Sequence, residues 1–182
     1  MKLEVDDEGW PDVGLKVRIE AAAEQAQTLE ELAAEAERER HFPGALLARM
    51  YLAHNYYESE RGQDAHKTAI RALLLAQEIG DLLAEAQLRR LLALIAWDEG
   101  RSKDGHDHVL EAMIAYEQLG REAEIAPLMR WYGEHLGVLG AMPEAEEALR
   151  EAERRYKVLG DENAAQACAA DLLAVRAHAL RH

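Results

Sequence analysis

A glycine recurs every twenty residues from position 80 to position 160, at Gly80, Gly100, Gly120, Gly140 and Gly160. Asp follows two of these glycines, at Asp81 and Asp161, and an aliphatic residue precedes Gly80, Gly120 and Gly160. An aliphatic residue, Gly and Asp in succession indicate a helix end, a left-handed residue and the N-cap of the next helix. A helix stop every twenty residues, within a period of forty, predicts a stack of helical hairpins. Such stacks usually hold other molecules and seldom carry out chemistry.

The composition limits the kinds of partner and the cellular compartment that we expect for this protein. The chain has 182 residues, of which 35 are acidic and 21 basic, so its net charge is −14. Such a surface repels nucleic acid and anionic lipid, which leaves good solubility or a basic partner as the simpler interpretations. A single cysteine, no run of about eighteen apolar residues and no secretory signal together predict a cytoplasmic protein without a membrane span. The richness in Ala, Arg and Glu hints at a bacterial source.

Breaks in the helical pattern divide the chain into segments. We expect an irregular N-terminus over residues 1–14 and a single domain over 15–182. Within that domain we predict an N-terminal helix or helix pair at 15–42, three repeats at 43–80, 81–120 and 121–160, and a capping helix at 161–182. Helix A of each repeat should span about 44–61, 82–99 and 122–139, and helix B about 64–79, 103–119 and 143–159. Thr28 and Glu31 resemble a capping box, which would separate two N-terminal helices near Gln27, and Pro127 should kink its helix or delay its start.

Aligned by number, the repeats share small residues in some columns and large residues in others. One column holds Ala72, Ala112 and Ala152, another holds Ala65, Gly105 and Ala145, and a third holds Leu52, Leu92, Tyr132 and Leu172. The third repeat also places Gly133, Gly140, Ala145, Leu149 and Ala152 at successive steps of seven, five, four and three residues. In these spacings the chain resembles the tetratricopeptide repeat (TPR) family, in the longer forty-residue variant of bacterial regulators. The resemblance implies an all-α, TPR-like solenoid of antiparallel helix pairs wound into a right-handed superhelix.

The resemblance also implies a groove for a peptide or protein segment, lined by the A helices. Carried over to this chain, the groove residues are Met50, His54, Tyr57, Arg90, Leu94, Trp97, Arg130, Trp131 and Glu134. Arg90 and Arg130 occupy equivalent positions and could together grip carboxylates of a partner. Two alternatives stay open: the tryptophans could pack between helices, and Arg130 could pair with Glu134 one helical turn away. If the groove prediction holds, replacing both arginines by Ala should abolish partner capture with little change in the melting temperature.

No constellation of residues converges on catalysis, so we do not expect an enzyme, a cofactor or a metal. His106 and His108 stand two residues apart, which is poor spacing for one ion on a helix. Cys168 lies on the apolar side of the last helix, where a small core residue is expected.

The function predicted from the sequence is therefore a non-catalytic protein-interaction module. One alternative is a scaffold that forms a homodimer through the last helix, where Leu172, Leu173, Val175 and Leu180 would supply the apolar contact. A second alternative is the sensory fragment of a bacterial regulator.

Overall fold

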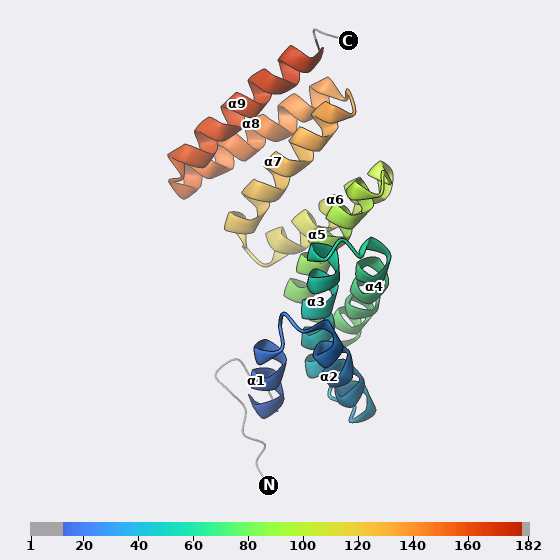
Figure 1. Ribbon diagram of the computed structural model, residues 1–182. Coiled ribbons are helices and arrows are strands. Elements are labelled where there is room, and N and C mark those ends of the chain that lie inside the picture. Colours follow the sequence, from blue (N-terminus) through green and yellow to red (C-terminus); the bar gives the residue numbers. More distant parts are fainter. Residues whose placement is uncertain (1–12, 180–182) are drawn as a thin grey trace. The chain divides into compact units, whose positions relative to one another are not determined.

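The computed structural model describes residues 13–179, and these form nine α-helices with no strand among them (Figure 1). The helices are α1 Val13–Ala21, α2 Ala26–Arg38, α3 Phe42–Glu58, α4 Gly62–Ile79, α5 Leu82–Asp98, α6 Ser102–Gln118, α7 Glu122–Val138, α8 Met142–Leu159 and α9 Glu162–Ala179. From α3 onward each helix begins and ends within about three residues of its predicted bounds. The predicted all-α architecture of paired helices is confirmed. Helices α3, α5, α7 and α9 are the A helices, and α2, α4, α6 and α8 are the B helices.

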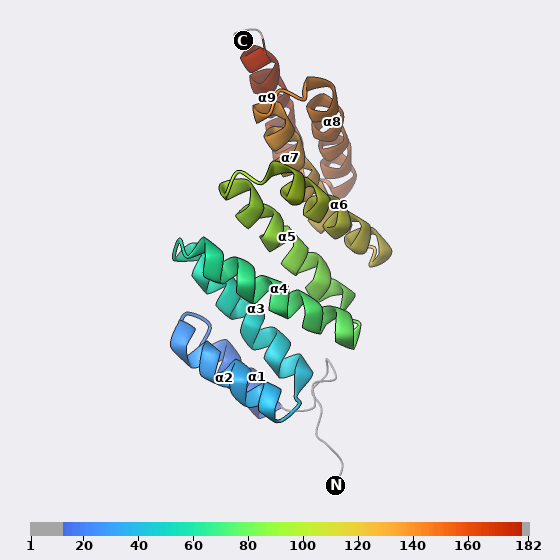
Figure 2. The ribbon, with the colours of Figure 1, turned by 90° about the vertical axis from the view of Figure 1, so that its right-hand side faces the viewer.

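The helices gather into two compact units, Met1–His108 and Val109–His182, with the boundary inside α6. In the first unit α3 packs against α2 and α4, α4 packs against α5, and α1 packs against α3. In the second unit α8 packs against both α7 and α9. Figure 2 shows α2, α3 and α4 side by side in the first unit, and α7, α8 and α9 together in the second. The single domain and the right-handed superhelix stay predictions.

The turns between helices repeat one backbone geometry. All five glycines of the twenty-residue series have positive φ, between 66° and 81°, as predicted. The residue after each glycine donates its backbone N–H to the carbonyl five residues earlier, as Asp81 does to Ala76 at 2.9 Å and Arg101 to Ala96 at 2.7 Å. This bond satisfies a carbonyl that the helix end would otherwise leave without a partner. The same turn therefore ends each of the helices α4 to α8 at the same phase.

The series extends beyond the glycines. Arg40 and Glu60 have φ of 58° and 57°, and they continue the twenty-residue spacing toward the N-terminus. The following residues, His41 and Arg61, donate to carbonyls five residues back at 2.8 Å. A left-handed residue that carries a Cβ costs about 1–2 kcal/mol. The sequence analysis missed these two turns because it recognised the turn only by its glycine.

Side chains cap the helices that start after these turns. Asp81 Oδ1 accepts from the N–H of Ala84 at 2.9 Å, and Asp161 Oδ1 accepts from Ala164 at 3.0 Å, so both predicted N-caps are confirmed. His41 caps α3 in the same way through Nδ1, at 3.0 Å from the N–H of Gly44. Three further turns end in an arginine that pairs with the carboxylate three residues later: Arg61 with Asp64, Arg101 with Asp104 and Arg121 with Glu124.

Three local predictions need correction. The predicted capping box is wrong, because Gln25 is the N-cap of α2 and the hydroxyl of Thr28, inside the helix, donates to Gln25 Oε1 at 3.2 Å. The break between α1 and α2 therefore lies before Gln25. Helix α1 begins at Val13, inside the segment predicted to be irregular, whose other residues lie outside the described range. Pro127 does not delay the start of α7, which begins at Glu122.

Small residues lie where helices approach closely. The column of Ala72, Ala112 and Ala152 is fully buried. A Cβ on Gly133 would lie 2.8 Å from Leu149 Cγ and 3.2 Å from the carbonyl oxygen of Ala145, so α7 and α8 need glycine at this position. The core of the first unit contains Ile19, Leu29, Leu88, Leu92 and Ile95, each at most 2% exposed.

The turn geometry predicts opposite effects for two substitutions. Gly100→Ala should lower the free energy of unfolding by about 1 kcal/mol through backbone strain alone, because nothing lies within 4 Å of the added Cβ. Arg40→Gly should raise it by about 0.5 kcal/mol, since relief of strain exceeds the entropy gained by the unfolded chain. Urea denaturation measures both, and an unchanged midpoint for Gly100→Ala would contradict the role of the turn.

Candidate functional site

The A helices of the first unit carry three predicted groove residues on α3, spaced four and three residues apart. Met50 is half-buried and packs against the core. His54 is exposed, with Nε2 3.1 Å from the carboxylate of Glu58. Tyr57 is half-buried and lies at the C-terminal end of α3. Met50 and Tyr57 both pack against the core, so His54 between them is the exposed residue of the three.

Tyr57 joins the two A helices of this unit. Its hydroxyl donates to Asp98 Oδ2 at 2.8 Å, from the end of α3 to the end of α5. Burial, and next the hydrogen bond and charge of Asp98, raise the pKa of Tyr57 to about 12. The phenol therefore stays protonated at neutral pH and keeps donating to Asp98.

A hollow of about 430 Å³ opens beside this hydrogen bond. Its lining consists of Tyr57, Glu60, Gly62, Ile95, Asp98 and Glu99. Glu99 is neutralised by Arg101, at 2.6 Å. Among the residues that the structure describes, no Lys or Arg pairs with Asp98 or Glu60. The hollow is consequently acidic, with one apolar wall at Ile95.

The predicted groove residues on α5 have different surroundings. Arg90 is exposed, and within residues 13–179 it forms no ion pair. Leu94 is half-buried. Trp97 lies against the first turn of α6, where a Cβ on Gly105 would be 2.2 Å from its Nε1, and its ring meets His106 edge-on at 6.2 Å. Burial lowers the pKa of His106, with a smaller opposing effect from Asp107.

In the second unit the predicted residues Arg130 and Glu134 form part of an ion-pair cluster. Arg130 Nε lies 2.6 Å from Asp171 Oδ2 on α9 and 3.1 Å from Glu134 Oε1. The hydrogen bond to Asp171 raises the pKa of Arg130. Burial, and next the charge of Asp171, raise the pKa of Glu134. The two carboxylates thus share one guanidinium, and Arg130 is already engaged within its own unit. Trp131, its neighbour on α7, is half-buried.

A second hollow, of about 290 Å³, lies between α7 and α9. It is lined by Glu134, Gly137, Val138, Asp171, Ala174 and Val175. A Cβ on Gly137 would lie 2.5 Å from Val175, so glycine at this position lets α9 come close to α7. The hollow combines an apolar wall with two carboxylates.

Both hollows contain an acid that the sequence analysis did not select, Asp98 in the first unit and Asp171 in the second. Each bonds to a predicted groove residue 41 residues earlier, Asp98 to Tyr57 and Asp171 to Arg130. A forty-residue period places equivalent residues of successive A helices side by side, so a search for polar pairs at this separation would have found both acids.

The residues predicted for self-association have unequal exposure. Leu173 is 66% exposed, whereas Val175 is 8% exposed and packs against Gly137. Leu172 is half-buried against the core of the second unit. Leu180 lies outside the described residues.

The cysteine and histidines considered as a nucleophile or as metal ligands lie on helices. Cys168 is buried, and burial raises the pKa of its thiol to about 11, which disfavours the reactive thiolate. His106 and His108 both lie on α6. Residues 13–179 contain no cluster of three His, Cys, Asp or Glu side chains that could hold a metal ion. No helix of this part of the chain is both long and apolar enough to cross a membrane.

Comparison with solved structures identifies the fold. BtubC (BKLC) of P. vanneervenii superposes with a TM-score of 0.57 at 18% identity, over 92% of each chain. A Podosopora anserina protein described as a putative kinesin light chain with nearly identical TPR-like repeats gives a TM-score of 0.62 at 15% identity, over 92% of this chain and 94% of that one. A single-residue variant of that protein gives the same TM-score and identity over 93% of its chain. No protein-family model matches the sequence, and no curated protein matches it either. The chain thus has the TPR-like α-solenoid fold predicted from its repeats.

The ion pairs predict different consequences for the two equivalent arginines. Arg130→Ala should lower the free energy of unfolding by about 1–3 kcal/mol, because Glu134 and Asp171 lose the cation between them. Arg90→Ala should leave the melting temperature unchanged, since the exposed guanidinium makes no ion pair in the described chain. Thermal denaturation of the two variants compares them directly, and equal melting temperatures would contradict the structural role of Arg130.

Proposed function

We propose that this protein is a non-catalytic interaction module that holds a segment of a partner protein against its A helices. The TPR-like fold supports this proposal, since stacked helix pairs present long surfaces suited to binding. The contact surface in the first unit comprises α3 and α5, and in the second unit α7 and α9. Each pair carries a hollow whose lining includes one predicted groove residue, Tyr57 in the first unit and Glu134 in the second.

The observation that carries the proposal is the shared chemistry of the two hollows. In each, carboxylates stand beside apolar side chains: Asp98 beside Ile95 in the first unit, and Glu134 and Asp171 beside Val138 in the second. A Lys or Arg side chain suits such a site, because its aliphatic stem covers apolar surface while its charge meets the carboxylate. The partner segment is therefore basic and amphipathic, which also agrees with the net charge of −14.

Replacing one carboxylate in each hollow by the amide of the same shape tests the proposal. The variant Asp98→Asn/Glu134→Gln keeps an acceptor for Tyr57 and the shape of both sites, but it removes two negative charges. We expect the partner captured from a lysate of the source cell to decrease about tenfold, as loss of charge pairing at two sites implies. Quantitative mass spectrometry of the captured proteins measures the change.

A matched variant separates the hollows from overall charge. Asp107→Asn/Glu147→Gln removes two exposed carboxylates from the B helices α6 and α8 and should leave capture unchanged. Equal loss in both variants would show that net charge alone determines binding. Capture that is unaffected by the first variant would overturn the proposal.

The exposed face of α9 supports a second candidate, a homodimer. Ala169, Ala170 and Leu173 are exposed on this helix, and Leu173 is the largest of them. Small residues allow two helix backbones to approach closely, and an exposed Leu gains from being covered.

Leu173→Glu tests this candidate. If the face pairs, light scattering should give a dimer mass for the natural protein at tens of micromolar and a monomer mass for the variant, because the charge would be buried at the contact. A monomer mass for the natural protein at that concentration would remove the candidate. The substitution lies on the surface, so the melting temperature of the monomer should stay the same.

A further inference from the structure

A further hollow of the first unit lies between the B helices α2 and α4. It measures about 760 Å³, with residues of α3 at its base. Arg61 and Asp64, paired at 2.7 Å, lie at one end, where the guanidinium of Arg61 also covers the ring of Tyr56 at 4.1 Å. We call this hollow the α2–α4 cleft.

Each of the two carboxylates in the α2 wall, on Glu30 and Glu37, accepts a hydrogen bond from a side chain of α3. Arg49 at the base is only 9% exposed, and its Nε donates to Glu37 Oε1 at 2.6 Å. Tyr56 donates its hydroxyl to Glu30, and burial followed by this hydrogen bond raises the pKa of Tyr56. The wall therefore keeps a single uncompensated negative charge, on Glu30.

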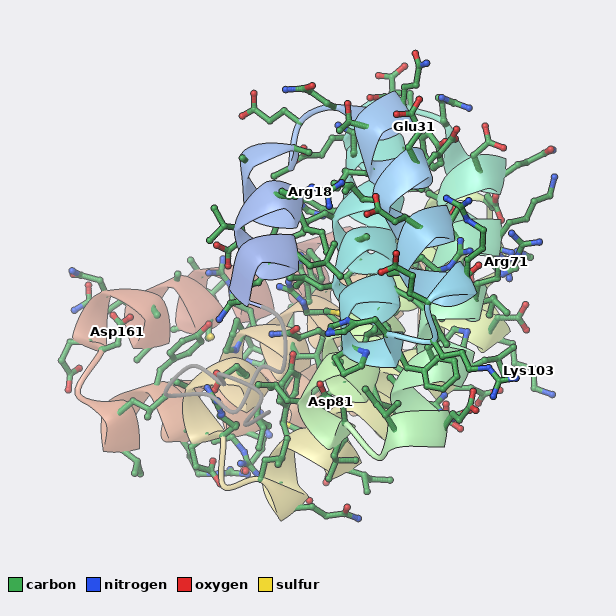
Figure 3. All side chains as sticks on the ribbon, turned by 90° about the horizontal axis from the view of Figure 1, so that it is seen from below. Arg18, Glu31, Arg71, Asp81, Lys103 and Asp161 are labelled. Carbon is green, nitrogen blue, oxygen red and sulfur yellow. The ribbon has the colours of Figure 1, made fainter. Side chains whose placement is uncertain are left out.

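The α4 wall carries positive charges instead. Lys67 and Arg71 are exposed at positions i and i+4 of one helix face, and neither forms an ion pair within the described chain. Figure 3 shows the side chain of Arg71 extending outward from the ribbon. Two like charges one turn apart repel each other by a few tenths of a kcal/mol, so an anion between them would be stabilised.

The interior of the cleft is partly apolar. Leu52 of α3 and Ile70 of α4 line it together with Ala34 of α2. A volume of about 760 Å³ exceeds what a single inorganic anion fills and falls in the range of sites that hold drug-sized or peptide ligands. An occupant with an apolar side chain and a nearby carboxylate fits both walls.

We propose that the α2–α4 cleft binds an acidic peptide segment of a partner protein, with a carboxylate between Lys67 and Arg71 and an apolar side chain over Leu52 and Ile70. This site is separate from the A-helix hollows in place and opposite to them in charge preference. The protein would thereby hold a basic segment at the A-helix hollows and an acidic segment at the cleft.

Fluorescence anisotropy with a labelled acetyl-(Leu-Glu)₃-amide peptide and the full chain tests the site. We expect saturable binding that weakens with added NaCl and falls about tenfold in Lys67→Gln/Arg71→Gln, which removes the two cations of the cleft that form no ion pair in the described chain. Glu30→Gln should tighten binding, because it removes the remaining negative charge of the cleft and keeps an acceptor for Tyr56. A merely structural role for Glu30 would not produce tighter binding.

The matched control is Arg90→Gln/Lys103→Gln, which removes two other cations of the same unit that form no ion pair in the described chain. It should bind the peptide like the natural protein. Absence of saturable binding, equal loss in the control variant, or no loss in the cleft variant would each overturn the proposal. Displacement of the peptide by inorganic phosphate, but not by chloride at equal ionic strength, would reassign the cleft to a phosphate ligand. The result of this experiment does not decide the A-helix proposal, since the cleft variant leaves Asp98 and Glu134 unchanged.

Discussion

The fold depends on one turn, in which a left-handed residue ends a helix and the next residue bonds to the carbonyl five positions earlier. Seven such bonds, from His41 to Asp161, lie twenty residues apart and measure 2.7–3.0 Å. Because the helices α2 to α8 all stop at the same phase, equivalent residues recur on equivalent faces. The buried alanine columns and the close approach at Gly133 follow from that regularity, since a small residue is needed wherever two backbones meet.

The sequence predicted the helices well because glycine marks this turn so plainly. The sequence was less informative where a residue other than glycine adopts the left-handed conformation or caps a helix. Arg40 and Glu60 adopt the same left-handed conformation without glycine, and His41 caps its helix without resembling a usual N-cap. The predicted capping box at Thr28 failed for a related reason. Ser, Thr, Asp and Asn are favoured at caps, but the N-cap of α2 is Gln25, whose side chain makes no capping hydrogen bond.

The candidate site was less predictable, because residue type does not reveal whether a charge is already paired. Tyr57 and Glu134, two of the predicted groove residues, line hollows, yet the acids that define those hollows come from the next A helix, 41 residues farther along the chain from Tyr57 and from Arg130. Arg130 was predicted to grip a partner, and the structure shows it held between Asp171 and Glu134. Pairs that form between repeats become visible only when the register of successive helices is known.

The ion pairs within each unit also determine which charged side chains are left to bind a partner. In the second unit every Lys and Arg among residues 109–179 pairs with a carboxylate, from Arg121 to Arg176. Free cations of the described chain belong instead to the first unit, and Lys67 and Arg71 stand together at the α2–α4 cleft. A chain with a net charge of −14 can bind acidic groups only where its cations are not consumed by its own carboxylates. The distribution of ion pairs, more than the composition, therefore supports the two proposals, a basic segment at the A-helix hollows and an acidic segment at the cleft.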